Sequence, residues 1–203
     1  MVRERIIMQA SDFFSLYGIK NISMDALASS LGISKRTIYE HFKNKEEILK
    51  NCILASQESR KREVAEIMRQ SENVMVGCLQ LINHYKYTRL PTDLFWIDIY
   101  KYYPEVYQSL QESMEKSNTY FKQLVEKGMQ DNYIRENIDV EEALCVLDVA
   151  TCIITYRDHP VRISLSRTDL IYNVMVNMLR GISTYKGIEI IDKYIDNIAH
   201  STN

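Results

Sequence analysis

The sequence predicts an all-α protein, and three observations support this fold class. Only 6 Gly and 3 Pro occur among 203 residues, so residues that interrupt helices are scarce. Apolar residues recur at three- and four-residue spacings along most of the chain, which is the period of an amphipathic helix. Where these periodic segments break, capping residues or proline stand at the breaks. With 46% hydrophobic residues, the chain is long enough to bury a substantial core.

Two helices are predicted before residue 33. The first covers residues 3–17, and Gly18 stands just past its end. Ser23 is placed to cap a second, short helix, which Gly32 ends because glycine readily adopts a positive φ. The apolar side of this second helix consists of Met24, Leu27, Ala28 and Leu31. We expect the first helix to cover the back of the pair formed by the second helix and the next one.

A third helix is predicted after Ser34, which is placed as its N-cap. Ile38 and Phe42, four residues apart, supply its inward side. Its outward side carries cationic and hydrogen-bonding side chains, namely Lys35, Arg36, Thr37, Tyr39 and His41. Two short helices joined by a glycine turn, the second opening with adjacent cations, are typical of a helix-turn-helix that reads DNA. A helix fits the major groove, and its N-terminal side chains meet the base edges first.

A fourth helix is predicted after Asn44, with Glu47 three residues later in a variant of the capping box. Lys43 and Lys45 flank this cap, and a helix N-terminus with a lysine beside it favours a phosphate. The alternative is an ordinary helical hairpin whose cations form only a solvated face. Phosphate-binding and base-reading residue types on one side favour DNA binding instead.

Residues 3 to about 50 resemble the N-terminal domain of the TetR/AcrR family of bacterial transcriptional regulators. Three segments carry the resemblance: residues 10–18 with their paired aromatic side chains, residues 23–28, and residues 32–49. The resemblance implies that Tyr39 and Lys45 touch phosphates and that the other outward residues lie at the groove. The predicted DNA-binding residues are Ser34, Lys35, Arg36, Thr37, Tyr39, His41 and Lys45.

Further helices are predicted along the rest of the chain, with proline or capping residues at the breaks. Their approximate ranges are 45–70, 72–89, 92–103, 105–131, 140–158 and 167–185, with a last amphipathic stretch after Gly187. Pro91 and Pro104 stand at two breaks, Asp139 is placed as a cap, and Pro160 ends the helix that follows that cap. Residues 161–165 alternate like a strand, but without a partner strand we expect a connecting loop.

We expect two domains, a DNA-binding domain over residues 1–48 and a helical ligand-binding and dimerisation domain over residues 49–203. Apolar stripes with small residues in 141–156 and 170–182 suit pairing between subunits. The resemblance implies a homodimer that packs the helices near 141–158 and 167–185 across a two-fold axis. Such a dimer matches a palindromic operator on double-stranded DNA. The alternative is that these stripes form the core within one chain.

Aromatic residues are concentrated in the middle of the chain. The predicted ligand-binding residues are Tyr85, Phe95, Trp96, Tyr100, Tyr103, Tyr107 and Tyr120. In similar proteins this part encloses a pocket for a small-molecule inducer, whose identity the sequence does not give; the plain alternative is that the rings fill the core. Asp98 stands among them, and we expect a solvated carboxylate there rather than a partner for a cationic ligand.

Charge and cysteine content are consistent with an intracellular regulator. The chain contains 25 Lys and Arg and 27 Asp and Glu. Residues 1–62 contain 11 of the basic and 7 of the acidic residues, so a basic N-terminal part precedes an acidic remainder. The chain opens on a charged amphipathic helix and has no apolar run of membrane-spanning length, so we expect a cytoplasmic protein without membrane contact. The widely spaced residues Cys52, Cys78, Cys145 and Cys152 fit buried, reduced thiols.

Enzymes form the competing class, but the sequence contains none of their local motifs. No His-x-x-x-His or Cys-x-x-Cys pair, phosphate loop or nucleophile elbow occurs, and the four histidines are far apart, so we expect no catalytic residues, metal or cofactor. The sequence therefore predicts a DNA-binding transcriptional regulator that a small molecule releases from its operator, and the resemblance implies a repressor. The alternative is a helical ligand-binding or adaptor protein that no longer reads DNA.

Overall fold

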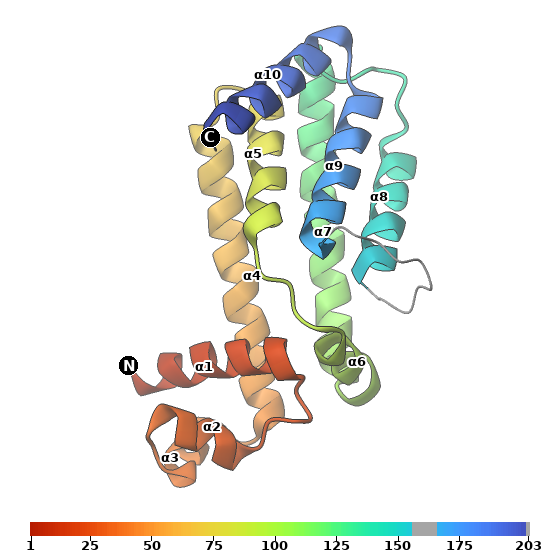
Figure 1. Cartoon of the computed structure of the whole chain (residues 1–203). Helices are drawn as coiled ribbons and strands as arrows, with labels where there is room; N and C mark the ends of the chain where they lie inside the picture. Colours follow the sequence, from red (N-terminus) through yellow and green to blue (C-terminus); the bar gives the residue numbers. More distant parts are fainter. Residues whose placement is uncertain (156–165, 202–203) are drawn as a thin grey trace. The chain divides into compact units, whose positions relative to one another are not determined.

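The computed structural model describes residues 1–155 and 166–201, apart from the side chains of 151–155, 199 and 201 (Figure 1). Within this part of the chain every regular element is an α-helix, as predicted. The helices are α1 (Val2–Tyr17), α2 (Met24–Leu31), α3 (Lys35–His41), α4 (Lys45–Gln70), α5 (Val74–Tyr87), α6 (Asp93–Tyr102), α7 (Pro104–Gln130), α8 (Val140–Thr155), α9 (Arg167–Ile182) and α10 (Tyr185–Ser201). The predicted loop at residues 161–165 lies outside the described residues.

The chain forms two compact units, which interleave along the sequence. Unit 1 comprises Met1–Arg62 and Arg89–Met114, and unit 2 comprises Glu63–Thr88 and Glu115–Asn203. Helix α6 thus belongs to the same unit as the N-terminal helices, although it follows them by some fifty residues in the sequence. The predicted domain boundary between residues 48 and 49 stays a prediction.

One hydrophobic cluster holds unit 1 together. Ile6, Ala10 and Phe14 recur every four residues on α1 and are all buried, as the helical period requires. The other buried members of the cluster are Ile19, Ile22, Leu27, Ala28, Ile38, Phe42, Ile48, Leu49, Cys52, Phe95, Ile99, Tyr103 and Val106. The N-terminal helices and α6 therefore share one core.

The predicted helix caps of unit 1 are confirmed. The Oγ of Ser23 accepts the backbone N–H of Ala26 at 3.0 Å, and the Oγ of Ser34 accepts that of Thr37 at the same distance. Gly32 ends α2 in the left-handed conformation, with φ of 66°. These contacts satisfy amide groups that a helix leaves unpaired at its start, so the ends of α2 and α3 are fixed locally.

Unit 2 is a helical bundle in which α9 packs against both α5 and α8, while α10 crosses α5 (Figure 1). The buried residues of its core are Val74, Met75, Cys78, Leu79, Ile82, Val125, Ile134, Val176, Leu179 and Ile191. The predicted cap by Asp139 is confirmed, since its Oδ1 accepts the N–H groups of Glu141 and Glu142 at 2.9 and 3.1 Å. Among the described residues, no helix is apolar over a length that could cross a membrane.

Helix α10 begins before Gly187, so the expectation that the last helix follows this glycine is wrong. The N–H of Gly187 donates to Oγ1 of Thr184 at 3.2 Å, and the N–H of Ile188 donates to the carbonyl of Thr184 at 2.9 Å. Gly187 is needed for packing rather than for a turn. A Cβ at this position would lie inside van der Waals contact of the carbonyl oxygen of Tyr133.

The cysteine prediction is correct for two residues and wrong for a third. Cys52 and Cys78 are buried, and burial raises the pKa of each thiol to about 12, which keeps both protonated. Cys145 is exposed on α8, because it lies on the side of that helix away from the buried Leu144. The side chain of Cys152 lies outside the described residues.

The packing at Gly187 leads to a stability prediction with a matched control. Gly187→Ala should lower the free energy of unfolding by about 1–3 kcal/mol, because a backbone carbonyl must move to admit the methyl group. Gly181→Ala, on α9 with nothing within 4 Å of its added Cβ, should instead be neutral or stabilising by up to roughly 1 kcal/mol. Urea unfolding followed by circular dichroism measures both, and equal effects would contradict the assigned contact.

Candidate nucleic-acid interface

Helices α2 and α3 form a helix-turn-helix in unit 1. Residues 32–34 connect them, and the two helices pack against each other. Ile38 and Phe42 are fully buried, so the inward side of α3 is fixed in the core of the unit. The side chains that the sequence predicts to be outward are thereby turned toward solvent.

The outward side of α3 is exposed and its polar contacts are weak. Lys35, Arg36, Tyr39 and His41 are exposed, with 48% of Tyr39 accessible, and Thr37 is partly exposed. The Nζ of Lys35 lies 2.8 Å from Oδ2 of Asp25, and this hydrogen bond raises the pKa of Lys35. The Nε of Arg36 lies 3.3 Å from Oε1 of Glu40. Such exposed ion pairs contribute little to stability, so both cations can exchange these partners for DNA groups.

Ser34 has a local role at the start of α3. In addition to the N–H of Thr37, its Oγ shares a hydrogen bond of 2.9 Å with Oγ1 of Thr37. Both hydroxyl groups are therefore engaged at the cap. A contact of Ser34 with DNA stays a prediction.

Lys45, the predicted phosphate contact of α4, has partners that the sequence did not reveal. Its Nζ donates to the carbonyl oxygens of Ile19 and Ile22 at 2.9 and 2.7 Å. Burial, followed by the nearby charge of Lys20, lowers the pKa of Lys45. An ammonium group has three donors, so one remains for a phosphate after these two bonds. Carbonyl partners more than twenty residues away leave no local sequence signal.

Asp98 is buried, so the expectation of a solvated carboxylate is wrong. Only 8% of the residue is exposed, and its Oδ2 accepts the backbone N–H of Lys20 at 2.7 Å. The carboxylate lies on the side of α6 that packs against the α1–α2 loop, which explains its burial. The carboxylate thus has its hydrogen-bond partner within unit 1. Sequence reasoning missed this role because the acceptor and donor are 78 residues apart.

The seven aromatic residues predicted to bind a ligand are divided between the two units. Phe95 and Tyr103 are buried in the cluster of unit 1, and Trp96 and Tyr107 pack against it. Tyr100 is exposed and stacks edge to face with Tyr107, with ring centroids 5.6 Å apart. Tyr85 and Tyr120 belong to unit 2, where Tyr120 is exposed. A ligand-binding role for these residues stays a prediction.

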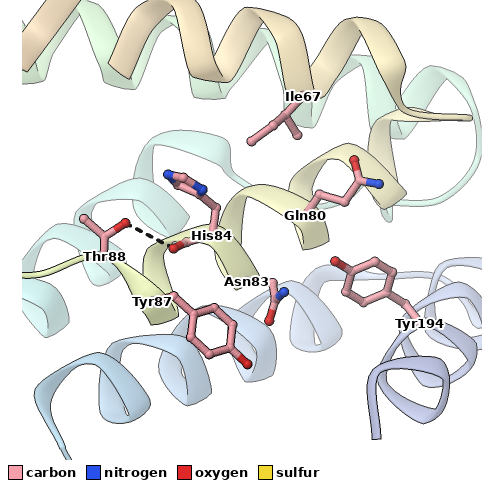
Figure 2. Close-up of a pocket in the computed structure, with 7 residues that line it drawn as sticks. All are labelled: Ile67, Gln80, Asn83, His84, Tyr87, Thr88 and Tyr194. Atoms are coloured by element: carbon pink, nitrogen blue, oxygen red, sulfur yellow. Dashed lines mark hydrogen bonds between the residues drawn. The ribbon is translucent and has the colours of Figure 1, made fainter. Parts of the chain in front are cut away.

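Unit 2 contains an open cavity of about 370 Å³, shown in Figure 2. Its lining comes from α4, α5 and α10 and consists of Ile67, Gln80, Asn83, His84, Tyr87, Thr88 and Tyr194. The Nε2 of His84 lies 3.3 Å from Oε2 of Glu63, and the hydroxyl of Thr88 donates to the carbonyl of His84 at 3.1 Å. The lining combines two amides, two phenols, an imidazole and a hydroxyl with the aliphatic side chain of Ile67, so its chemistry is mainly polar and aromatic. None of the seven predicted aromatic residues lines this cavity.

Comparison with known proteins places residues 6–52 in the family described as bacterial regulatory proteins, tetR family. An uncharacterized HTH-type transcriptional regulator of Bacillus subtilis, YhgD, is 26% identical over 138 residues, which are 66% of this chain and 72% of YhgD. The HTH-type transcriptional regulator UidR of Escherichia coli is 41% identical over 56 residues, or 28% of this chain and 29% of UidR. The match to UidR has the higher sequence identity of the two, but it covers only a short part of each chain.

A solved structure resembles the whole fold. A transcriptional regulator from Saccharomonospora viridis, crystallised in complex with choline, has a TM-score of 0.76 and 17% sequence identity, covering 90% of this chain and 98% of that one. At this identity the likeness concerns the fold alone. Together with the helix-turn-helix of α2 and α3, the family match indicates that residues 6–52 form a helix-turn-helix domain like that of bacterial regulatory proteins of the tetR family.

Proposed function

We propose that the chain is a homodimeric repressor that binds a palindromic operator and leaves it when a small molecule binds unit 2. The exposed side of α3 carries this proposal, because Lys35, Arg36 and Tyr39 combine base-reading and phosphate-binding groups on a helix anchored in a core. The chain acts by binding rather than by catalysis, like the regulators to which it is similar. A cytoplasmic location follows from this role.

Dimer formation is supported by the surface of α8. Val146 and Val149 are 61% and 53% exposed, whereas Leu144 on the same helix is buried and α8 packs against α9. Val146 and Val149 are not members of the stripe predicted from the sequence, and they form an apolar surface of α8 that is exposed within one chain. We propose that α8 and α9 of two copies pack together. Reading of adjacent major grooves requires the two α3 helices of such a dimer to lie roughly 34–36 Å apart, or one turn of DNA.

Effector control is supported by the cavity of unit 2. Its volume of about 370 Å³ suits a small molecule, and its lining mixes rings with amide groups. The choline complex of the Saccharomonospora viridis regulator shows that this fold accommodates a small molecule in that protein. The ligand can weaken DNA binding only by the difference between its affinities for the two dimer shapes, typically about 1–3 kcal/mol or roughly 5- to 150-fold.

Two substitutions separate base reading from phosphate binding. Arg36→Ala should cost about 1–3 kcal/mol on the preferred sequence and relax the preference at particular bases. Lys45→Ala should weaken binding to every duplex and lower the salt slope by about one, with a further loss on the preferred sequence because Lys45 also holds the carbonyls of Ile19 and Ile22. Fluorescence anisotropy on a DNA panel at several salt concentrations measures both effects.

Lys61→Ala, which removes an exposed cation of α4, is the control and should change affinity less than twofold. If Arg36→Ala and Lys45→Ala gave the same uniform loss on every duplex, the assigned division of roles would be wrong.

The proposed dimer surface can be tested by placing a charge on it. Val149→Glu should weaken dimerisation about 100-fold or more, since an unpaired carboxylate would be buried between subunits. Tyr185→Glu, at a position 90% exposed on α10, should leave dimerisation unchanged. Sedimentation velocity across a concentration series measures the dissociation constant, and a Val149→Glu dimer as tight as wild type would refute this surface.

A further inference from the structure

We propose that Asp98 is a positioning residue for DNA binding, which acts with Lys45 to hold the loop of residues 18–23 between α1 and α2. We call Asp98, Lys45 and this loop the loop clasp. The inference rests on the proposed function, because the helices that the loop positions are the ones proposed to meet DNA. Asp98 itself is not proposed to touch DNA.

The carboxylate of Asp98 closes one side of the loop clasp. Its Oδ2 accepts the N–H of Lys20 at 2.7 Å and lies 3.2 Å from the position that a Cβ of Gly18 would occupy. Gly18 has φ of 80°, a conformation that side-chain-bearing residues rarely adopt. The loop thus adopts a conformation that lets α6 approach its backbone closely. A buried carboxylate without such a donor would be costly, so Asp98 and the loop constrain each other.

The ammonium group of Lys45 closes the other side. It donates to the carbonyls of Ile19 and Ile22. These residues lie one position before and two positions after Lys20, whose N–H donates to Asp98. The negative charge of Asp98 favours the ammonium form of Lys45, although burial lowers the pKa of that group. The loop is therefore held through two carbonyls by a cation and through one amide by an anion.

Two further contacts fix α6 against the same part of unit 1. The N–H of Thr92, at the start of α6, donates to the carbonyl of Ser15 on α1 at 2.9 Å. The Nζ of Lys20 lies 4.5 Å from the ring centroid of Tyr102 at the other end of α6. Both ends of α6 thus contact α1 or the loop. The loop leads directly into Ser23, the cap of α2, and α2 packs against α3.

Removing the negative charge of Asp98 has opposite expected effects on DNA affinity in a positioning role and in a purely electrostatic role. Asp98 is negative, so removing its charge from a unit that binds a polyanion should strengthen binding if only the long-range field mattered. The loop clasp predicts the opposite result. Loss of a hydrogen bond to a charged group should displace α2 and α3 and weaken binding about tenfold or more.

The test compares Asp98→Ala and Asp98→Asn with Lys101→Gln, which changes one exposed charge on the same helix. The readouts are affinity for a genomic fragment selected by the wild-type protein, affinity for random duplex, and amide hydrogen exchange at Lys20. Asp98→Ala should lower the affinity for the selected fragment about tenfold or more and change the affinity for random duplex less than twofold. It should also speed amide hydrogen exchange at Lys20. Asp98→Asn, which retains an acceptor oxygen, should show a smaller loss. Lys101→Gln should leave exchange unchanged and weaken both duplexes alike.

Unchanged or tighter binding of the selected fragment by both Asp98 variants would overturn the proposal. If Asp98→Ala does not fold by circular dichroism, Asp98→Asn decides the question. If the wild-type protein selects no fragment, the proposed function fails separately, and exchange at Lys20 still tests the loop clasp. Exchange at Lys20 that stays at the wild-type rate in the Asp98 variants would then overturn it.

Discussion

Helix α3 depends on the burial of two side chains, because seven residues are too few for a helix to be stable alone in water. Ile38 and Phe42 supply this burial, and each contributes about 1.5–3 kcal/mol when removed from water. The same two residues determine which side of α3 faces outward. The local cap at Ser34 fixes where the helix begins, but only the shared core with α1 fixes how it is turned. The exposed cations have a defined direction for this reason.

Apolar packing alone does not define the path of the loop before α2, since hydrophobic contacts lack direction. Hydrogen bonds supply that direction, and the structure provides them from α6 through Asp98 and from α4 through Lys45. Both groups are ionisable and at least partly buried, which is unfavourable unless each has partners. Their partners are backbone groups of the same loop. The N-terminal helices and α6 therefore share a single core in unit 1. The hydrogen bonds of Asp98 and Lys45 define the path of the loop beside that core.

The sequence was sufficient for what depends on local spacing. The helical period and the caps at Ser23, Ser34 and Asp139 gave the helices to within a few residues, because these signals lie within one or two turns. Features that depend on distant partners were missed or wrongly expected. The burial of Asp98 requires a loop 78 residues away, and the place of Gly187 inside α10 depends on the carbonyl of Tyr133. The DNA contacts and the ligand-binding rings remain predictions.

Regulation by an effector requires different affinities for the two dimer shapes, because an effector that binds both shapes equally leaves DNA binding unchanged. Effector control presupposes that two copies of α3 read adjacent major grooves. Footprinting of purified protein on genomic fragments tests this reading of adjacent grooves most directly. We predict a protected tract with two-fold related half-sites about one helical turn apart. Uniform protection of all fragments, or no protected tract for a folded dimer, would show that two α3 helices do not read such a site.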